Sequence, residues 1–303
     1  MIACSGSVGF DTIRTPFRTV ERTLGGAAAY FAYSASFFDG VSIATAVGAD
    51  FPNSFRETLA QKGVDLTGVE TLPGESFSFD CSFGFDLSVR KANETRLGVL
   101  ESLEPRVPPS LASRECVAYL ATAPPASQLS FLKQLPNNRL SIIDTIEFFI
   151  QRDRAEVLAA FRQVDGVVLN DAEARMAAGT PNLLKAGFSL LQSGLKFVVV
   201  KKGEDGCILF HAGRAYPFPA FPLEDVVDPS GAGDAFAGGL VGWLSKRGVT
   251  RDSLSPRVLR EAVAYGSVMG SFIVEDFGLA RLQRLELQDV EARLEEFKEL
   301  TRL

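Results

Sequence analysis

Short apolar runs alternate with longer stretches of helical periodicity along most of the chain. The apolar runs are rich in Val and Ile, which is typical of strands that are buried on both faces. The stretches between them have helical spacing, so the pattern predicts an α/β fold with a mostly parallel central sheet covered by helices on both faces. The apolar runs occupy residues 41–48, 139–146, 164–170, 195–203 and 206–213, and the helical stretches occupy residues 53–63, 154–163 and 171–179.

One segment has a different pattern, with strict alternation of apolar and polar positions over residues 76–89. Such alternation predicts a strand with one apolar face. A second pair of candidate strands lies nearer the N-terminus. We expect both segments to leave the main sheet as a small β lid, formed by about 11–24 and 75–100 within a single domain spanning 1–303. The apolar face of the first segment comprises Phe77, Phe79, Cys81, Phe83, Phe85, Leu87 and Val89.

The composition narrows the class of protein. The chain has 303 residues, of which 46% are hydrophobic, and a formal net charge of -6, which allows a large buried core. Its Lys and Arg residues are scattered, so the acidic chain is a poor partner for nucleic acid. No apolar run approaches the roughly 20 residues of a membrane helix, and the first residues lack the basic and apolar regions of a signal peptide. We therefore expect a cytoplasmic protein with no membrane partner and no nucleic-acid partner.

Cysteine and histidine usage argues against other classes of site. The four cysteines stand far apart without paired spacing, which favours buried, reduced thiols over disulfides or zinc. The chain has one histidine, His211, on a strand-like segment without a partner motif. This argues against a Ser-His-Asp triad or a histidine-rich metal site. The cysteines are Cys4, Cys81, Cys116 and Cys207.

A glycine-rich stretch, VVDPSGAGDAFAGGLVGW at residues 226–243, contains the start of a predicted helix at Asp234. Gly231, Ala232 and Gly233 have little or no side chain, so their amides can approach a ligand closely. The start of a helix also presents free N–H groups and the positive end of the helix dipole. Together these features predict an anion site.

Asp234 gives this anion site a chemical interpretation. A carboxylate beside amides that hold a phosphate is placed to take a proton from an attacking alcohol, which is a phosphoryl-transfer arrangement. Two alternatives remain open at this point. Asp234 and the glycines would also fit a helix cap after a turn. A dinucleotide-binding turn fits less well, because Phe236 stands at its third glycine position.

The segment DPSGAGDAFAGG, residues 228–239, resembles the C-terminal signature of the ribokinase-like, or PfkB, carbohydrate and nucleoside kinases. The resemblance implies a ribokinase-like three-layer αβα sandwich with a mostly parallel central sheet and a small β lid. It also implies that Asp234 is the catalytic base. The amides of Gly231, Ala232 and Gly233 would form the anion hole.

The resemblance continues near the N-terminus, where LGGAAAYFA resembles the glycine pair that the family places near its substrate. It implies that Asp11, in GSVGFD, binds substrate hydroxyls. Tyr30 stands where the sugar kinases of the family commonly have an asparagine. An aromatic ring can stack on a base, so a nucleoside remains an alternative substrate. Asp144, at the end of a predicted strand, is positioned for polar contacts. The expected substrate-binding residues are therefore Asp11, Gly25, Gly26, Tyr30 and Asp144.

Two further segments resemble the family's nucleotide side. In VVLNDAEA, Asn170 would approach the nucleotide phosphates and Glu173 would help to hold Mg2+ through water. In VVVKKGEDG, Lys201 and Gly203 would contact the nucleotide. Asp228, which opens the glycine-rich signature, is expected on the same side. The implied cofactors are ATP and Mg2+, and a monovalent cation such as K+ is a further candidate.

The resemblance thus implies an ATP- and magnesium-dependent kinase. We expect it to phosphorylate a hydroxyl of a small sugar or sugar derivative, ahead of a nucleoside, and to form a homodimer through its lid. The alternative in a different class is a catalytically silent member that binds nucleotide or sugar as a sensor, against which the intact Asp234 argues. Structural roles also remain open for Asp11 as a loop carboxylate, for Glu173 as a solvated helix residue and for Lys201 as a strand end.

Overall fold

A nine-stranded sheet forms the centre of the structure, a computed structural model that describes residues 1–87 and 90–302. Neighbouring strands in this sheet are parallel over most of its width, as the sequence pattern predicts. From edge to edge the strands are β13 (Arg214–Phe218), β12 (Cys207–His211), β11 (Phe197–Lys201), β10 (Gly166–Asn170), β9 (Asn138–Ile143), β8 (Cys116–Leu120), β1 (Ile2–Ser5), β4 (Val41–Gly48) and β5 (Asp65–Leu72).

One edge of the sheet departs from the parallel pattern. The apolar run at 206–213, expected as another parallel strand, forms β12, which pairs antiparallel with β11. Strand β13 then pairs antiparallel with β12. The cause is the connection between β11 and β12, a single short turn at Gly203–Asp205, because a parallel pairing needs a crossover of a dozen residues or so.

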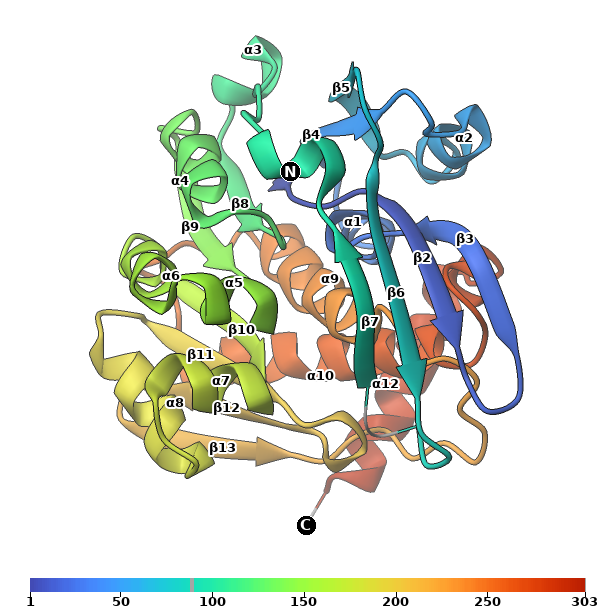
Figure 1. Cartoon of the computed structure of the whole chain (residues 1–303). Helices are drawn as coiled ribbons and strands as arrows, with labels where there is room; N and C mark the ends of the chain where they lie inside the picture. Colours follow the sequence, from blue (N-terminus) through green and yellow to red (C-terminus); the bar gives the residue numbers. More distant parts are fainter. Residues whose placement is uncertain (88–89, 303) are drawn as a thin grey trace.

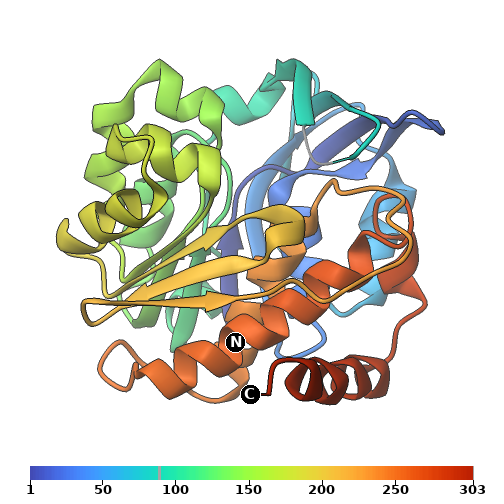
Figure 2. The same cartoon turned by 90° about the horizontal axis from the view of Figure 1, so that it is seen from below.

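Helices cover both faces of the sheet and give the three-layer α/β arrangement that the sequence predicts (Figures 1 and 2). One helical layer contains α1 (Ala27–Ala35), α9 (Ala232–Lys246), α10 (Pro256–Ile273) and α12 (Leu287–Leu300). The other contains α4 (Pro125–Lys133), α5 (Glu147–Arg152), α6 (Arg154–Phe161), α7 (Asp171–Ala178) and α8 (Leu183–Gln192). The remaining helical segments are α2 (Asn53–Gln61), η1 (Gly98–Ser102), α3 (Pro109–Ala112) and α11 (Ala280–Gln283). Among the residues that the structure describes, no helix is both long enough and apolar enough to cross a membrane.

A second, four-stranded sheet stands beside the main one, and we call it the lid sheet (Figure 1). The strand predicted to run to Val89 ends at Phe83, and a hydrogen bond from the Leu87 N–H to the Gly84 carbonyl closes a turn there. Turn chemistry therefore overrides the alternation of the sequence. Phe85 in this turn is 84% exposed rather than part of a buried face, and Val89 lies outside the described residues. The lid sheet is ordered β3 (Thr19–Gly25), β2 (Gly9–Arg14), β6 (Phe77–Phe83) and β7 (Arg90–Arg96).

Close packing of α1 against α9 fixes the position of the glycine-rich helix start. A Cβ atom added at Gly238 would lie 2.5 Å from the Ser34 Cβ and 2.6 Å from the Phe31 carbonyl oxygen, so only glycine fits there. The Ser34 hydroxyl also donates a 2.7 Å hydrogen bond to the carbonyl of Ala235. The start of α9 is therefore held against α1 by both packing and a buried hydrogen bond.

We expect Gly238→Val to lower the free energy of unfolding by about 1–3 kcal/mol, because the added atoms must push α1 and α9 apart. Urea unfolding followed by circular dichroism measures this change. The matched control is Gly40→Val, since a Cβ atom at Gly40 meets nothing within 4 Å. Equal stability losses in the two variants would contradict the proposed tight contact.

Candidate active site

The carboxyl ends of the parallel strands bring several predicted site residues to one end of the sheet. Asp144 follows β9, Asn170 ends β10 and Lys201 ends β11. From β1 the chain continues to β4 on one side, and β8 later adds on the other side. In open α/β sheets ligands bind outside the carboxyl ends at such a switch point, so the fold favours this position for a ligand.

The glycine-rich turn presents backbone donors at the start of α9. Gly231 is the N-cap residue with φ 73°, a left-handed conformation that favours glycine. A Cβ atom there would lie 2.7 Å from Cγ of Tyr30, so the turn packs directly on that ring. The Ala232 N–H donates to the Pro229 carbonyl at 3.2 Å. The next two amides, of Gly233 and Asp234, lie in the first helical turn, where N–H groups have no intrahelical acceptor, and are the available anion donors.

The Asp228 carboxylate fixes the glycine-rich turn by accepting hydrogen bonds from backbone N–H groups. It is fully buried, and its two carboxyl oxygens accept hydrogen bonds from the N–H groups of Ser230 at 2.8 Å and Gly278 at 3.2 Å. Burial raises the pKa of this carboxyl, while the Ser230 bonds oppose the rise. The contacts of Asp228, expected on the nucleotide side, are thus with the backbone of two loops, which they tie together.

A largely enclosed lysine lies among the carboxylates of the site. The Lys201 ammonium is 3.4 Å from Oδ2 of Asp144, and a Cβ atom at Gly233 would lie 2.7 Å from that ammonium. Burial alone would lower the pKa of Lys201, but Asp144 and Glu173 raise it. The lysine therefore stays charged and places a cation beside the free amides of the turn.

Asp234 is the acidic group on the first turn of α9. Burial, and after it the charge of Asp144, raises its pKa to about 7, while Lys201 opposes the rise. A carboxyl group with this pKa is partly ionised near neutral pH and can accept a proton there. The arrangement can therefore support base chemistry next to an anion site.

Asn170 and Glu173 form a capping box at the start of α7. The Asn170 side chain accepts from the Glu173 N–H at 2.7 Å, and Oε2 of Glu173 accepts from the Asn170 N–H at 2.8 Å. Glu173 is only 3% exposed, and burial raises its pKa to about 8. The cap leaves the Asn170 amide nitrogen and the second Glu173 oxygen for other partners. Glu173 is therefore not the solvated helix residue that remained open from the sequence.

Asp11, Gly25, Gly26 and Tyr30 come together on the other side of the turn. A Cβ atom at Gly25 would overlap the Asp11 carboxyl group, so the glycine admits the carboxylate. Gly26 is the N-cap of α1 with φ 92°. Burial raises the pKa of Asp11 to about 7, and the neighbouring Tyr30 hydroxyl lowers it. That hydroxyl is buried and has no partner at hydrogen-bonding geometry among the described residues.

Gly203, expected to contact the nucleotide, lies in the turn that follows Lys201. It opens this short turn with φ 58°, and a Cβ atom there would meet nothing within 4 Å. Its left-handed conformation fits a requirement of the turn for glycine, and its contact with a nucleotide stays a prediction.

Sequence reasoning missed residues that support the site. The Tyr119 hydroxyl donates to Oδ2 of Asp144 at 3.3 Å, and the Tyr119 ring stacks on Phe31 of α1 at 3.7 Å between centroids. The Ser7 hydroxyl accepts a 2.9 Å hydrogen bond from the Ala27 N–H at the start of α1. A tyrosine within an apolar strand was the available signal, because a buried hydroxyl needs a partner.

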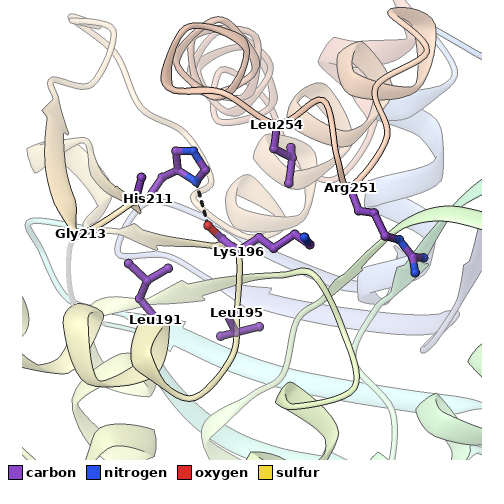
Figure 3. Close-up of a pocket in the computed structure, with 8 residues that line it drawn as sticks. Leu191, Leu195, Lys196, His211, Gly213, Arg251 and Leu254 are labelled. Atoms are coloured by element: carbon purple, nitrogen blue, oxygen red, sulfur yellow. Dashed lines mark hydrogen bonds between the residues drawn. The ribbon is translucent and has the colours of Figure 1, made fainter.

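A separate cavity of about 360 Å³ lies at the amino end of β11, between α8 and the turn after β12 (Figure 3). It is therefore at the opposite end of the sheet from the carboxylates. His211 lines it, and its Nδ1 donates a 2.8 Å hydrogen bond to the Lys196 carbonyl. Among the residues that the structure describes, no carboxylate and no expected site residue lines this cavity.

Three comparisons show what the chain resembles. The pfkB family carbohydrate kinase domain matches residues 140–284. A cytidine kinase of Thermococcus kodakarensis is 32% identical over 249 residues, which cover 80% of this chain and 87% of that protein. A Burkholderia thailandensis nucleoside kinase solved with inosine superposes with a TM-score of 0.77 at 18% identity, covering 98% of this chain and 97% of that one. A putative ribokinase II from E. coli, solved with ATP and Mg2+, superposes with a TM-score of 0.76 at 17% identity, covering 97% and 99% of the two chains.

The raised pKa of Asp11 predicts a pH-dependent stability. The folded carboxyl keeps its proton up to about pH 7, whereas the unfolded group loses it near 3.8. Its contribution is therefore fully present below about pH 4 and is lost as the pH rises through about 7. Relative to wild type, Asp11→Asn should gain on the order of 1–4 kcal/mol between about pH 4 and pH 8.

Urea unfolding across this pH range measures the difference. Asp252→Asn, which removes an exposed carboxylate, is the control and should show no comparable gain. A stability difference between Asp11→Asn and wild type that is the same at both ends of the range would contradict the buried, protonated Asp11.

Proposed function

Because the chain belongs to the pfkB family of carbohydrate kinases, enzymes that phosphorylate hydroxyl groups, we propose that it transfers the γ-phosphoryl group of ATP to a hydroxyl of a nucleoside. The observation that carries this proposal is the half-buried Asp234 on the first turn of α9, beside free amides and the Lys201 ammonium. The same observation argues against a silent sensor, because binding alone does not need a group with a pKa of about 7.

Asp234 acts as the general base. The acceptor hydroxyl gives its proton to the Asp234 carboxylate while its oxygen forms a bond to the γ-phosphorus. The bond from that phosphorus to the β-phosphate oxygen breaks, and its electron pair leaves with ADP. Burial of Asp234 supports this role, because the pKa of about 7 leaves a useful fraction ionised and still basic enough to take the proton.

The turn and the lysine stabilise the negative charge of the phosphates. The free amides of Gly233 and Asp234 and the Lys201 ammonium form the anion hole, and the small residues Gly231 and Ala232 let a phosphate approach these donors. Donors that are fixed before the reaction stabilise developing charge without reorganisation. The contact of the lysine with the Gly233 position supports a shared phosphate site. On the far side of Lys201, Asn170 contributes its free amide to the nucleotide.

Mg2+ would be held jointly by a protein carboxylate and the phosphates of ATP, and not by the protein alone. Among the described residues no cluster of three or more His, Cys, Asp or Glu side chains could hold a metal ion. Mg2+ commonly keeps several waters and binds through one or two carboxylates plus substrate phosphates. The free oxygen of Glu173 would hold it, through water, and the ion would supply charge neutralisation of the ATP phosphates.

The acceptor is a nucleoside rather than a free sugar. The sequence motifs alone favour a sugar over a nucleoside as the substrate. A relative whose match covers 80% of this chain is, however, a cytidine kinase, and this favours a nucleoside. Asp11 binds ribose hydroxyls beside Gly25 and Gly26, and the Tyr30 ring fills the space against the anion turn. Asp144, fixed by Tyr119 and Lys201, orients the lysine toward the phosphates.

The lid sheet covers the acceptor and keeps water out during transfer. Its inner apolar residues are buried against the chain itself, with Ile13, Cys81 and Phe83 in one cluster. The exposed rings of Phe17 and Phe85 lie 6.2 Å apart at its tip. Pairing of two chains through these lids stays a prediction, for which those two rings are the available apolar surface.

We expect Asp234→Asn to lower kcat by at least about 100-fold while the melting temperature changes little, because the amide keeps the shape but cannot accept the proton. Coupled ADP release with cytidine, inosine, adenosine, ribose and fructose measures it. In the wild type kcat/KM should rise with pH through about 7, as the base ionises.

The matched control is Asp289→Asn, which removes the acidic residue at the same third position of a helix, α12, away from the site. This control should keep its turnover. Near wild-type turnover in Asp234→Asn would reduce Asp234 to a helix cap and overturn the proposed mechanism.

Glu173→Gln should raise the magnesium concentration needed for half-maximal activity by about tenfold or more and change the nucleoside KM much less. Glutamine preserves the capping box, so the helix start survives. Initial rates across a magnesium titration measure the shift. Glu156→Gln, at the start of α6, is the control, and an unchanged magnesium requirement in Glu173→Gln would remove Glu173 from the site.

A further inference from the structure

Arg90 faces the inner side of the lid sheet. In the antiparallel pair of β6 with β7, Arg90 stands directly opposite Phe83, and residues directly opposite in such a pair point to the same face. Phe83 is buried in the apolar cluster of the lid, so Arg90 shares that face, where Arg90 itself remains exposed. Its neighbour Lys91 points to the opposite face because side chains alternate along a strand.

An aromatic ring, not a carboxylate, holds the Arg90 guanidinium in place. Its Cζ atom lies 5.3 Å from the centroid of the Phe79 ring. Arg14, on β2, is by contrast paired with Asp80 at 2.9 Å. No such ion pair involves Arg90 among residues 1–87 and 90–302. A guanidinium over a ring keeps its donors available for a planar oxyanion ligand.

The inner face of the lid touches the glycine-rich turn. Sγ of Cys81 lies 3.8 Å from Oγ of Ser230, the residue immediately before Gly231. Phe79, beneath the Arg90 guanidinium, stands two residues from Cys81 on the same strand. One face of β6 therefore carries both the ring beneath the Arg90 guanidinium and the cysteine that contacts the residue before Gly231.

The charge of Arg90 acts on both sides of the site. It lowers the pKa of Asp11 on the acceptor side and of Glu173 on the nucleotide side. It also lowers the pKa of Asp234 between them. Burial is the larger cause of the pKa of each of these groups, and the Arg90 charge opposes the rise at all three.

We propose that Arg90 is the lid residue that contacts the phosphoryl group during its transfer, an inference that rests on the proposed kinase function. As the bond between the γ-phosphorus and ADP breaks and the acceptor oxygen bonds to that phosphorus, Arg90 donates hydrogen bonds to the non-bridging oxygens. The proton still goes to Asp234 and the electron pair to ADP. The lid thereby adds charge to the site only when it covers the substrates.

Steady-state kinetics with ATP, Mg2+ and cytidine test this role in three variants. Arg90→Gln should lower kcat by about 100-fold with the cytidine KM within about threefold, since the contact forms mainly in the transition state. Arg90→Lys keeps the charge without the fork and should recover part of the loss. Lys91→Gln removes the same charge from the outer face and should stay at wild-type kcat.

The pH profile separates charge from structure. The groups that face Asp234 are Asp144, Lys201, Asp11, Tyr30, Tyr119 and Cys4 besides Arg90. Losing the Arg90 cation favours the protonated acid, so the acid limb of kcat/KM should move to higher pH in Arg90→Gln and stay in place in Arg90→Lys.

A kcat for Arg90→Gln within about threefold of wild type, a change confined to the cytidine KM, or an equal loss in Lys91→Gln would each overturn the role of Arg90 while the wild type still transfers phosphate. A wild type that phosphorylates none of the five acceptors would instead overturn the proposed function itself.

Discussion

Partial withdrawal of the Asp234 carboxyl group from water is the constraint on which the rest of the site depends. This desolvation, reinforced by Asp144, holds its pKa at about 7. A carboxylate that loses part of its hydration is costly unless donors or cations lie beside it. The site tolerates it because the amide of Gly233 and the Lys201 ammonium lie beside it. The same partners that stabilise the base also provide the charge that a phosphate requires.

Small residues make this arrangement possible. Gly238 lets α9 approach α1, Gly231 packs on the Tyr30 ring and Gly25 admits the Asp11 carboxyl group. A methyl group at any of the three positions would meet atoms at 2.7 Å or less. These glycines therefore serve the packing around α1 and α9 as well as the anion site. This explains why a stretch so rich in glycine is still part of a stable helix, since its interior is fully packed.

The features that sequence reasoning predicts well are those written in local patterns. Strand β4 spans the residues expected for it, and the start of α9 falls within two residues of Asp234. The predictions that differ depend on chain connections. The direction of β12 follows from the turn after Lys201, and β6 stops at Phe83 because a turn closes there. The contribution of Arg90 depends on strand register, which no single segment reveals.

A carboxyl carbon-13 NMR titration of the folded protein tests the role of Asp234 most directly, with Asp234→Asn used to assign its resonance. A partly desolvated base at this position predicts a resonance that titrates with an apparent pKa of about 7 and that is absent from the variant. A wild-type protein in which every resonance that the variant lacks titrates near the ordinary value of 3.8 would contradict this role, because Asp234 would then be a freely solvated carboxylate and not a partly desolvated base.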